Sequence, residues 1–216
     1  MYKHKYTLLL LCSIIFLLTF TPILTAAASI PPSNVIKGIF YIGSEKSEYP
    51  IIRTDNSDVN YKINRDIQNY IADMRAAVDS TKNPTTSIMQ YKIYYETNTI
   101  ISIVFKEYRY YYHAAHGMYF IHGIVYNKST GAKIPITHYL NMTPDDLQNA
   151  INNHTAKVFG GNGNTPIKCN DIYKIKYISK NYSLLKKDGR LYISLIYPPY
   201  ELAPYVVGIV RINIPL

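Results

Sequence analysis

Between Ile88 and Tyr126 the chain alternates apolar or aromatic side chains with polar ones, and this pattern limits the possible folds most. A period of two places successive side chains on opposite faces of a strand. The pattern therefore predicts three long strands separated by turns at Asn98 and at Ala115-His116-Gly117. Short turns between neighbouring strands favour an antiparallel meander, with strands at Ile88–Glu96, Ile100–Tyr110 and Met118–Asn127.

Two other segments carry a helical period. Apolar residues spaced by three and four predict an amphipathic helix over about Tyr61–Ser80, ended by Asn83-Pro84: Ile63, Ile67, Tyr70, Ile71, Met74 and Val78. A second helix is predicted from the capping sequence Thr143-Pro144-Asp145-Asp146 to about Val158. We expect its inward positions to be Leu147, Ile151, Ala150 and His154.

Short apolar runs predict the remaining strands. Lys187-Asp188-Gly189 is a strong hairpin signal. Gly160–Gly163 is expected to be a mobile loop, and Tyr200–Tyr205 a short turn. The fold class is therefore α+β, with antiparallel sheets and two main helices. The strands are expected at Val35–Ile42, Tyr49–Arg53, Ile134–Tyr139, Ile172–Ile178, Tyr182–Lys186, Arg190–Tyr197 and Val206–Ile214.

The N-terminus is typical of an export signal. Lys3 and Lys5 precede an uncharged stretch that runs from Tyr6 to Ile36, and Ala26-Ala27-Ala28 supplies small residues for cleavage. We expect a signal peptide over 1–28, cleavage near Ala28, and an extracytoplasmic protein that is secreted or associated with the envelope. Cleavage would leave no membrane span. The alternative is an uncleaved membrane anchor.

Cysteine content and charge restrict stability and partners. Cys12 lies in the signal, so Cys169 would be the single remaining cysteine and no intramolecular disulfide could form. The apolar core must then provide the stability. The net charge is +9, and it would be +7 without Lys3 and Lys5 of the signal. This positive charge favours anionic partners such as wall polymers, although solubility alone would also explain it. Nucleic acid is not predicted as a partner, because the basic residues form no recognisable reading motif.

The chain also resembles a bacterial extracytoplasmic domain family, the one found in RsiV and PdaC. The segments that carry the resemblance are Tyr111–Gly117, Thr130–Ile134 and Pro199–Tyr205, followed by Gly208 and Ile214-Pro215. The resemblance implies a domain of unknown function 4163 followed by a domain of unknown function 3298. We therefore expect an N-terminal α+β domain at 29–125 and a C-terminal one at 126–216. In this family the domain has sensory or accessory roles, including lysozyme sensing.

The candidate ligand-binding residues are His116, Tyr200, Glu201 and Tyr205. A carboxylate between tyrosines could bind sugar hydroxyls or peptide amides, or it could brace a structural corner. His113, His116 and His122 are poorly spaced for metal binding, so no metal and no cofactor is predicted. Cys169 is interpreted as an ordinary thiol, and the sequence contains no recognisable catalytic set.

The sequence thus predicts a non-enzymatic binding or sensory module for a ligand of the cell envelope or of a host. The expected partners are an anionic wall polymer, peptidoglycan or lysozyme. Three alternatives remain: a cell-wall hydrolase that uses Glu201 and His116, a lysozyme-binding protein, and a purely structural envelope protein.

Overall fold

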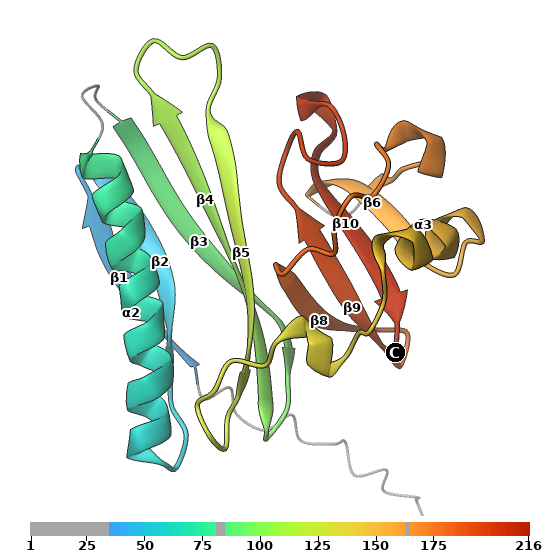
Figure 1. The fold of residues 1–216 in the computed structure, drawn as a ribbon. Coiled ribbons are helices and arrows are strands. Elements are labelled where there is room, and N and C mark those ends of the chain that lie inside the picture. Colours follow the sequence, from blue (N-terminus) through green and yellow to red (C-terminus); the bar gives the residue numbers. More distant parts are fainter. Residues whose placement is uncertain (1–34, 81–84, 163–164) are drawn as a thin grey trace, which may run out of the picture. The chain divides into compact units, whose positions relative to one another are not determined.

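The computed structural model describes residues 35–80, 85–162 and 165–216 (Figure 1). The predicted signal at 1–28, the helix-ending Asn83-Pro84 and Gly163 lie outside these ranges.

The first elements are two paired strands, β1 (Val35–Ile42) and β2 (Glu45–Ile52). β2 begins at Glu45, four residues before the predicted strand start at Tyr49. The reason is tertiary, because Ser47 is fully buried and its Oγ accepts a hydrogen bond from the Met89 N–H at 2.9 Å.

Helix α2 (Ser57–Asp79) confirms the first predicted helix but begins earlier than Tyr61. The Asn56 side chain accepts hydrogen bonds from the backbone N–H groups of Asp58 and Val59, which caps the first turn. One face of the helix is buried. It contains five of the six predicted residues and Val59, whereas the predicted Tyr70 is half-buried: Val59, Ile63, Ile67, Ile71, Met74 and Val78.

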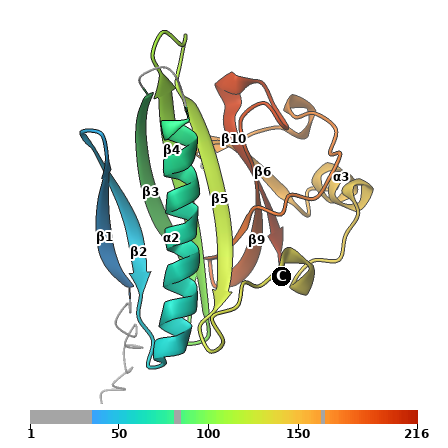
Figure 2. The ribbon, with the colours of Figure 1, turned by 60° about the vertical axis from the view of Figure 1, so that its left-hand side comes forward.

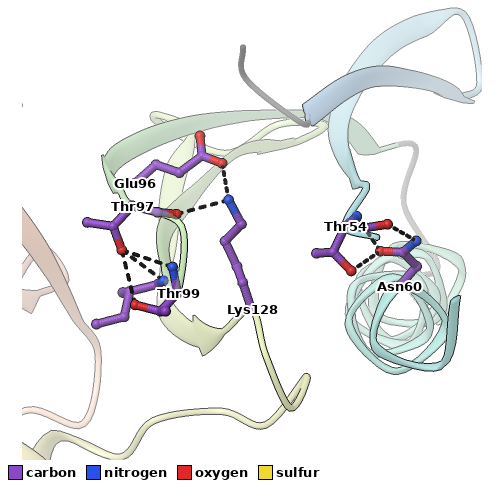
Figure 3. Close-up of polar contacts among 7 residues, drawn as sticks. Thr54, Asn60, Glu96, Thr97, Thr99 and Lys128 are labelled. Carbon is purple, nitrogen blue, oxygen red and sulfur yellow. Dashed lines mark hydrogen bonds and ion pairs between the residues drawn. The ribbon is translucent and has the colours of Figure 1, made fainter. Parts of the chain in front are cut away.

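Two asparagines attach α2 to the preceding strand. The Asn60 amide accepts from the Thr54 N–H at 2.6 Å and donates to the Thr54 carbonyl at 3.0 Å (Figure 3). One turn later Asn64 does the same with Ile52, at 2.8 Å in both directions. Each side-chain amide satisfies a backbone donor and acceptor as a neighbouring strand would, which fixes the helix against the end of β2.

The predicted meander is confirmed as a sheet in the order β3–β4–β5. Its strands are β3 (Thr85–Glu96), β4 (Ile100–Tyr111) and β5 (Met118–Asn127). Side chains such as Ile101, Ile103 and Phe105 pack with α2 in one apolar cluster. Beside the sheet, the buried Lys128 ammonium binds the Glu96 carboxylate at 2.8 Å and the Thr97 carbonyl at 3.0 Å (Figure 3), which joins the end of β5 to the β3–β4 turn.

The second sheet has the strand order β7–β6–β10–β9–β8 and is also antiparallel. Its strands are β6 (Lys157–Asn162), β7 (Thr165–Pro166), β8 (Tyr182–Lys187), β9 (Arg190–Tyr197) and β10 (Gly208–Pro215). The hairpin predicted between β8 and β9 is confirmed. The loop expected from Gly160 is wrong, because Gly160 and Gly161 lie within β6, and Gly161 pairs with Gly208 of β10.

Helix α3 (Pro144–Asn152) has the predicted capping box between Thr143 and Asp146. It ends before Val158, which belongs to β6 instead. Leu147 and Ile151 are buried as expected, whereas His154 is exposed and adopts a positive φ of 59° after the helix. The short helix thus covers the outer apolar face of the second sheet, in one cluster with Leu184 and Val210.

Two predicted strands are absent from the described residues. In the segment 134–139, the chain makes a single bridge at Lys133 and then a 3₁₀ turn, Ile136–His138, because Pro135 has no N–H to continue a ladder. The segment 172–178 is irregular. Its backbone bonds to loops and side chains: the Tyr173 N–H donates to the Leu202 carbonyl, and the Ile175 N–H donates to the Gln148 side chain.

The two sheets pack face to face (Figures 1 and 2), with α2 on the far side of the first and α3 on the far side of the second. Val104 and Ile121 meet Ile196 and Ile209 between them. Direct hydrogen bonds also cross the interface: the Leu184 N–H donates to Ser102 Oγ at 2.9 Å, and the Asn181 amide donates to the Ile121 carbonyl at 3.2 Å.

The α+β class is confirmed, with antiparallel sheets and two α-helices in the described ranges. The described residues belong to one compact unit, and β5 runs through position 125. The division into two domains at that position stays a prediction. Neither of the two described helices has both the length and the apolar character needed to span a bilayer.

The sheet interface depends on Gly123, because a Cβ there would lie 2.4 Å from the backbone oxygen of Tyr182. We expect Gly123→Ala to separate the sheets locally and to lower the free energy of unfolding by about 1–3 kcal/mol. Urea denaturation measures this. The matched control is Gly160→Ala, whose Cβ would meet the side chain of Val207 rather than backbone as its nearest neighbour, and which should cost less. Equal losses for the two variants would contradict the prediction.

Candidate functional site

The candidate residues lie where two connections meet at one end of the sheets. One is the turn between β4 and β5, and the other is the segment 198–207 between β9 and β10 (Figure 1). The two connections are in direct contact, because the Tyr205 hydroxyl donates to the Gly117 carbonyl at 2.6 Å. Residues more than eighty positions apart in sequence are thereby brought together.

His116, Tyr200 and Tyr205 form a ring stack, which we call the aromatic cluster. The imidazole of His116 stacks on the Tyr205 ring, with centroids 4.2 Å apart and planes 23° apart. The Tyr200 ring lies 5.2 Å from that of Tyr205, and its hydroxyl is 3.5 Å from His116 Nε2. Tyr200 has a φ of 74°, which is uncommon for a bulky residue, so the local backbone is held in an unfavourable conformation that directs this ring.

The Gly117 carbonyl fixes the orientation of the cluster. It lies 2.6 Å from the Tyr205 hydroxyl and 3.0 Å from His116 Nδ1, which can both donate to it. A proton on Nδ1 leaves Nε2 as an acceptor for the Tyr200 hydroxyl. A Cβ at Gly117 would lie 2.3 Å from the Tyr108 ring, so a larger residue there would require that ring to move.

The cluster continues along the face of the first sheet that meets the second. Tyr108 of β4 and Tyr119 of β5 have ring centroids 5.2 Å apart, and the Lys106 ammonium lies 4.3 Å from the centre of the Tyr119 ring. The pKa of Tyr205 is raised, first by desolvation and then by neighbouring tyrosines that include Tyr119 and Tyr108. A row of flat aromatic faces with a cation beside it can bind sugars or other ring-shaped ligands by stacking.

Glu201 lies in the same connection but is engaged differently. Its carboxylate accepts a hydrogen bond from the Tyr177 hydroxyl. Tyr177 is held in turn by Tyr197, whose hydroxyl donates to the Tyr177 carbonyl at 2.9 Å. Desolvation raises the pKa of Glu201. The carboxylate of Glu201 is thus engaged by a tyrosine hydroxyl of the protein itself.

The structure separates the three histidines of the sequence motif. His113 has a φ of 67° and its ring contacts Tyr112. His122 points to the other face of the sheet, where it stacks on Tyr70 at 4.6 Å, and burial lowers its pKa. Within the described residues, no group of three or more His, Cys, Asp or Glu side chains could hold a metal ion.

Sequence reasoning did not identify Tyr108, Tyr119, Lys106 and Tyr177 as neighbours of the site. The first three carried a usable signal, since they lie on one face of β4 and β5 by strand alternation. Tyr177 carried none, because its segment is irregular. No reasoning from the sequence placed His116 against Tyr205, because that contact depends on how the two sheets pack.

Comparison with known proteins finds likeness in structure alone. No family model and no curated protein matches the chain. A crystal structure of a DUF3298 family member from Bacteroides fragilis is similar, with a TM-score of 0.50 and 12% identity over 84% of this chain and 88% of that one. A DUF3298 family protein from Pseudomonas aeruginosa gives a TM-score of 0.50 and 14% identity over the same shares of the two chains. The suspected resemblance is thus confirmed at the level of the fold.

The hydroxyl of Tyr205 joins the two connections, so its removal should loosen them. We expect Tyr205→Phe to lower the free energy of unfolding by about 1 kcal/mol, the value of a typical hydrogen bond. Chemical denaturation measures the loss, and Tyr112→Phe at an exposed site is the control. A Tyr205→Phe variant as stable as the wild-type protein would contradict the assigned contact.

Proposed function

We propose that this protein is a non-enzymatic binding module that acts outside the cytoplasm and recognises its ligand through the aromatic cluster. The observation that carries the proposal is the stack of His116, Tyr205 and Tyr200, which presents aromatic faces and hydroxyl groups at the meeting point of two connections. Such rings give a ligand a large contact area at a low cost in side-chain entropy, and the hydroxyl groups add directional hydrogen bonds.

Exposed apolar side chains around the cluster support a binding role. Tyr112 and Met118 flank the β4–β5 turn, and Tyr200 and Val206 lie in the connection to β10. Their exposed fractions are 55%, 40%, 55% and 91%, respectively. Exposed apolar residues that gather in two contacting connections favour an interaction surface over a simple corner.

The ligand class follows from charge and location. Without the two lysines of the predicted signal the chain has a net charge of +7 (23 − 2 − 14), and Lys106 lies directly beside the aromatic row at Tyr119. Cationic groups next to aromatic faces suit an anionic carbohydrate. Together with the predicted export signal, this favours a wall polymer or peptidoglycan as the ligand. The same positive charge disfavours lysozymes, which are themselves cationic.

The aromatic cluster should therefore determine retention on envelope material. We expect Tyr200→Ala to weaken binding to purified peptidoglycan or wall polymer about tenfold or more, because a stacking aromatic residue at a binding site is commonly worth more than 1 kcal/mol. Co-sedimentation with the insoluble polymers measures the effect. Tyr61→Ala is the matched control, since Tyr61 is an exposed tyrosine on α2.

Four results would overturn this proposal. Loss of binding in both variants, or in neither, would place recognition elsewhere. Turnover of peptidoglycan fragments that disappears in Glu201→Gln would favour the hydrolase. Retention on lysozyme but on no envelope polymer would favour the lysozyme-binding alternative. A protein with neither binding nor turnover would be a structural one.

A further inference from the structure

The second sheet has a buried arginine, Arg211, on its central strand. Arg211 lies in β10, which is flanked by β6 and β9, and only 5% of it is exposed. Its Nε and Nη1 atoms are buried and have no hydrogen-bond partner among the described residues. Within the same residues, no carboxylate forms an ion pair with it.

Such an arrangement is costly, because a buried charge is normally paired and hydrogen-bonded. The chain itself provides the comparison. Arg109 is similarly buried, at 6% exposed, but its Nε and Nη2 atoms lie 2.9 and 2.7 Å from Oε1 of Glu107. Arg211 lacks such a carboxylate, and its guanidinium contacts the face of Tyr94 at 4.7 Å. A neutral ring attracts a cation but leaves its N–H donors unsatisfied.

Arg211 borders a pocket of about 290 Å³ between β3, β4 and β10. Other cationic and polar side chains line the same pocket: Lys106, Lys92 and Gln90. Burial and the charge of Arg211 both lower the pKa of Lys106, so the two cations lie close enough to repel each other. Tyr94 forms part of the wall and also contacts the Lys92 ammonium, at 4.9 Å.

We propose that this pocket binds an oxyanion, a carboxylate or a phosphate group, with Arg211 as its principal ligand. Nε and Nη1 of the guanidinium are donors that no group of the described residues satisfies, so an oxygen of such an anion can accept from them. Lys106 supplies a second positive charge. The volume is at the lower end for ligand pockets, which fits a small anion or one charged group of a larger molecule.

The oxyanion site goes beyond the proposed aromatic cluster and does not require it. The two are nevertheless connected, because Lys106 borders the pocket and also contacts Tyr119, which leads to Tyr108. A single anionic polymer could reach both. The test uses free anions, so its outcome is independent of whether the aromatic cluster binds carbohydrate.

The thermal unfolding midpoint is measured in phosphate, in acetate and in chloride at equal ionic strength. An anion that binds only the folded protein raises the midpoint, and at equal concentration the tighter-binding anion raises it more. We expect phosphate, acetate or both to raise the midpoint above that in chloride, and by more in the wild-type protein than in Arg211→Met, because phosphate also stabilises proteins that do not bind it. The anion with the larger difference between the two proteins identifies the group that the site prefers. Arg211→Met should weaken the binding constant of that anion about tenfold or more, as expected for loss of a charge-assisted hydrogen bond.

Arg190→Met removes the same charge at an exposed position and should leave the anion effect unchanged. If Arg211→Met does not fold, the side-chain Nε–Hε signals of the wild-type protein are followed by NMR during titration. A selective shift of the Arg211 signal supports the site. No midpoint change relative to chloride, an equal change in Arg211→Met, or no selective shift of the Arg211 signal would overturn the proposal.

Discussion

The close approach of the two sheets at Gly123 is the constraint on which the rest of the structure depends. A Cβ at this position would lie 2.4 Å from the Tyr182 carbonyl oxygen, so only glycine lets the backbones come so near. Nearby, the Leu184 N–H donates to Ser102 Oγ at 2.9 Å across the same interface. The interface is thus fixed by backbone and short side chains, with a small apolar contribution from residues such as Val104 and Ile196.

Both candidate binding features depend on this packing, because each takes residues from both sides of it. The aromatic cluster combines His116 of the β4–β5 turn with Tyr205 of the connection to β10. The oxyanion pocket combines Lys106 of β4 with Arg211 of β10. Neither is complete on one sheet alone. The packed sheets therefore account for how a chain without a recognisable catalytic motif can still present specific chemistry.

Elements with a regular period were predictable from the sequence, whereas features that depend on packing were not. The strands of the meander and α2 lie where their hydrophobic patterns predict them, because one face of each is buried, although α2 and β3 begin four and three residues earlier than predicted. The strand containing Gly160 was missed because glycine carries no side-chain pattern. Arg211 was missed because a charged residue in the alternating pattern of a strand normally faces water. In this structure both faces of β10 are covered by other layers. The contact of His116 with Tyr205 depends on the sheet packing, which the sequence does not encode locally.

Native-state hydrogen exchange tests most directly whether the two sheets form one cooperative unit. Under conditions where exchange reports the opening free energy, the amide of Leu184, which bonds across the interface, is compared with amides in the centres of β4 and β9. The account predicts one common free energy for all three. The two sheets do not form one cooperative unit if the Leu184 and β9 amides exchange through an opening of lower free energy while the β4 amides stay protected.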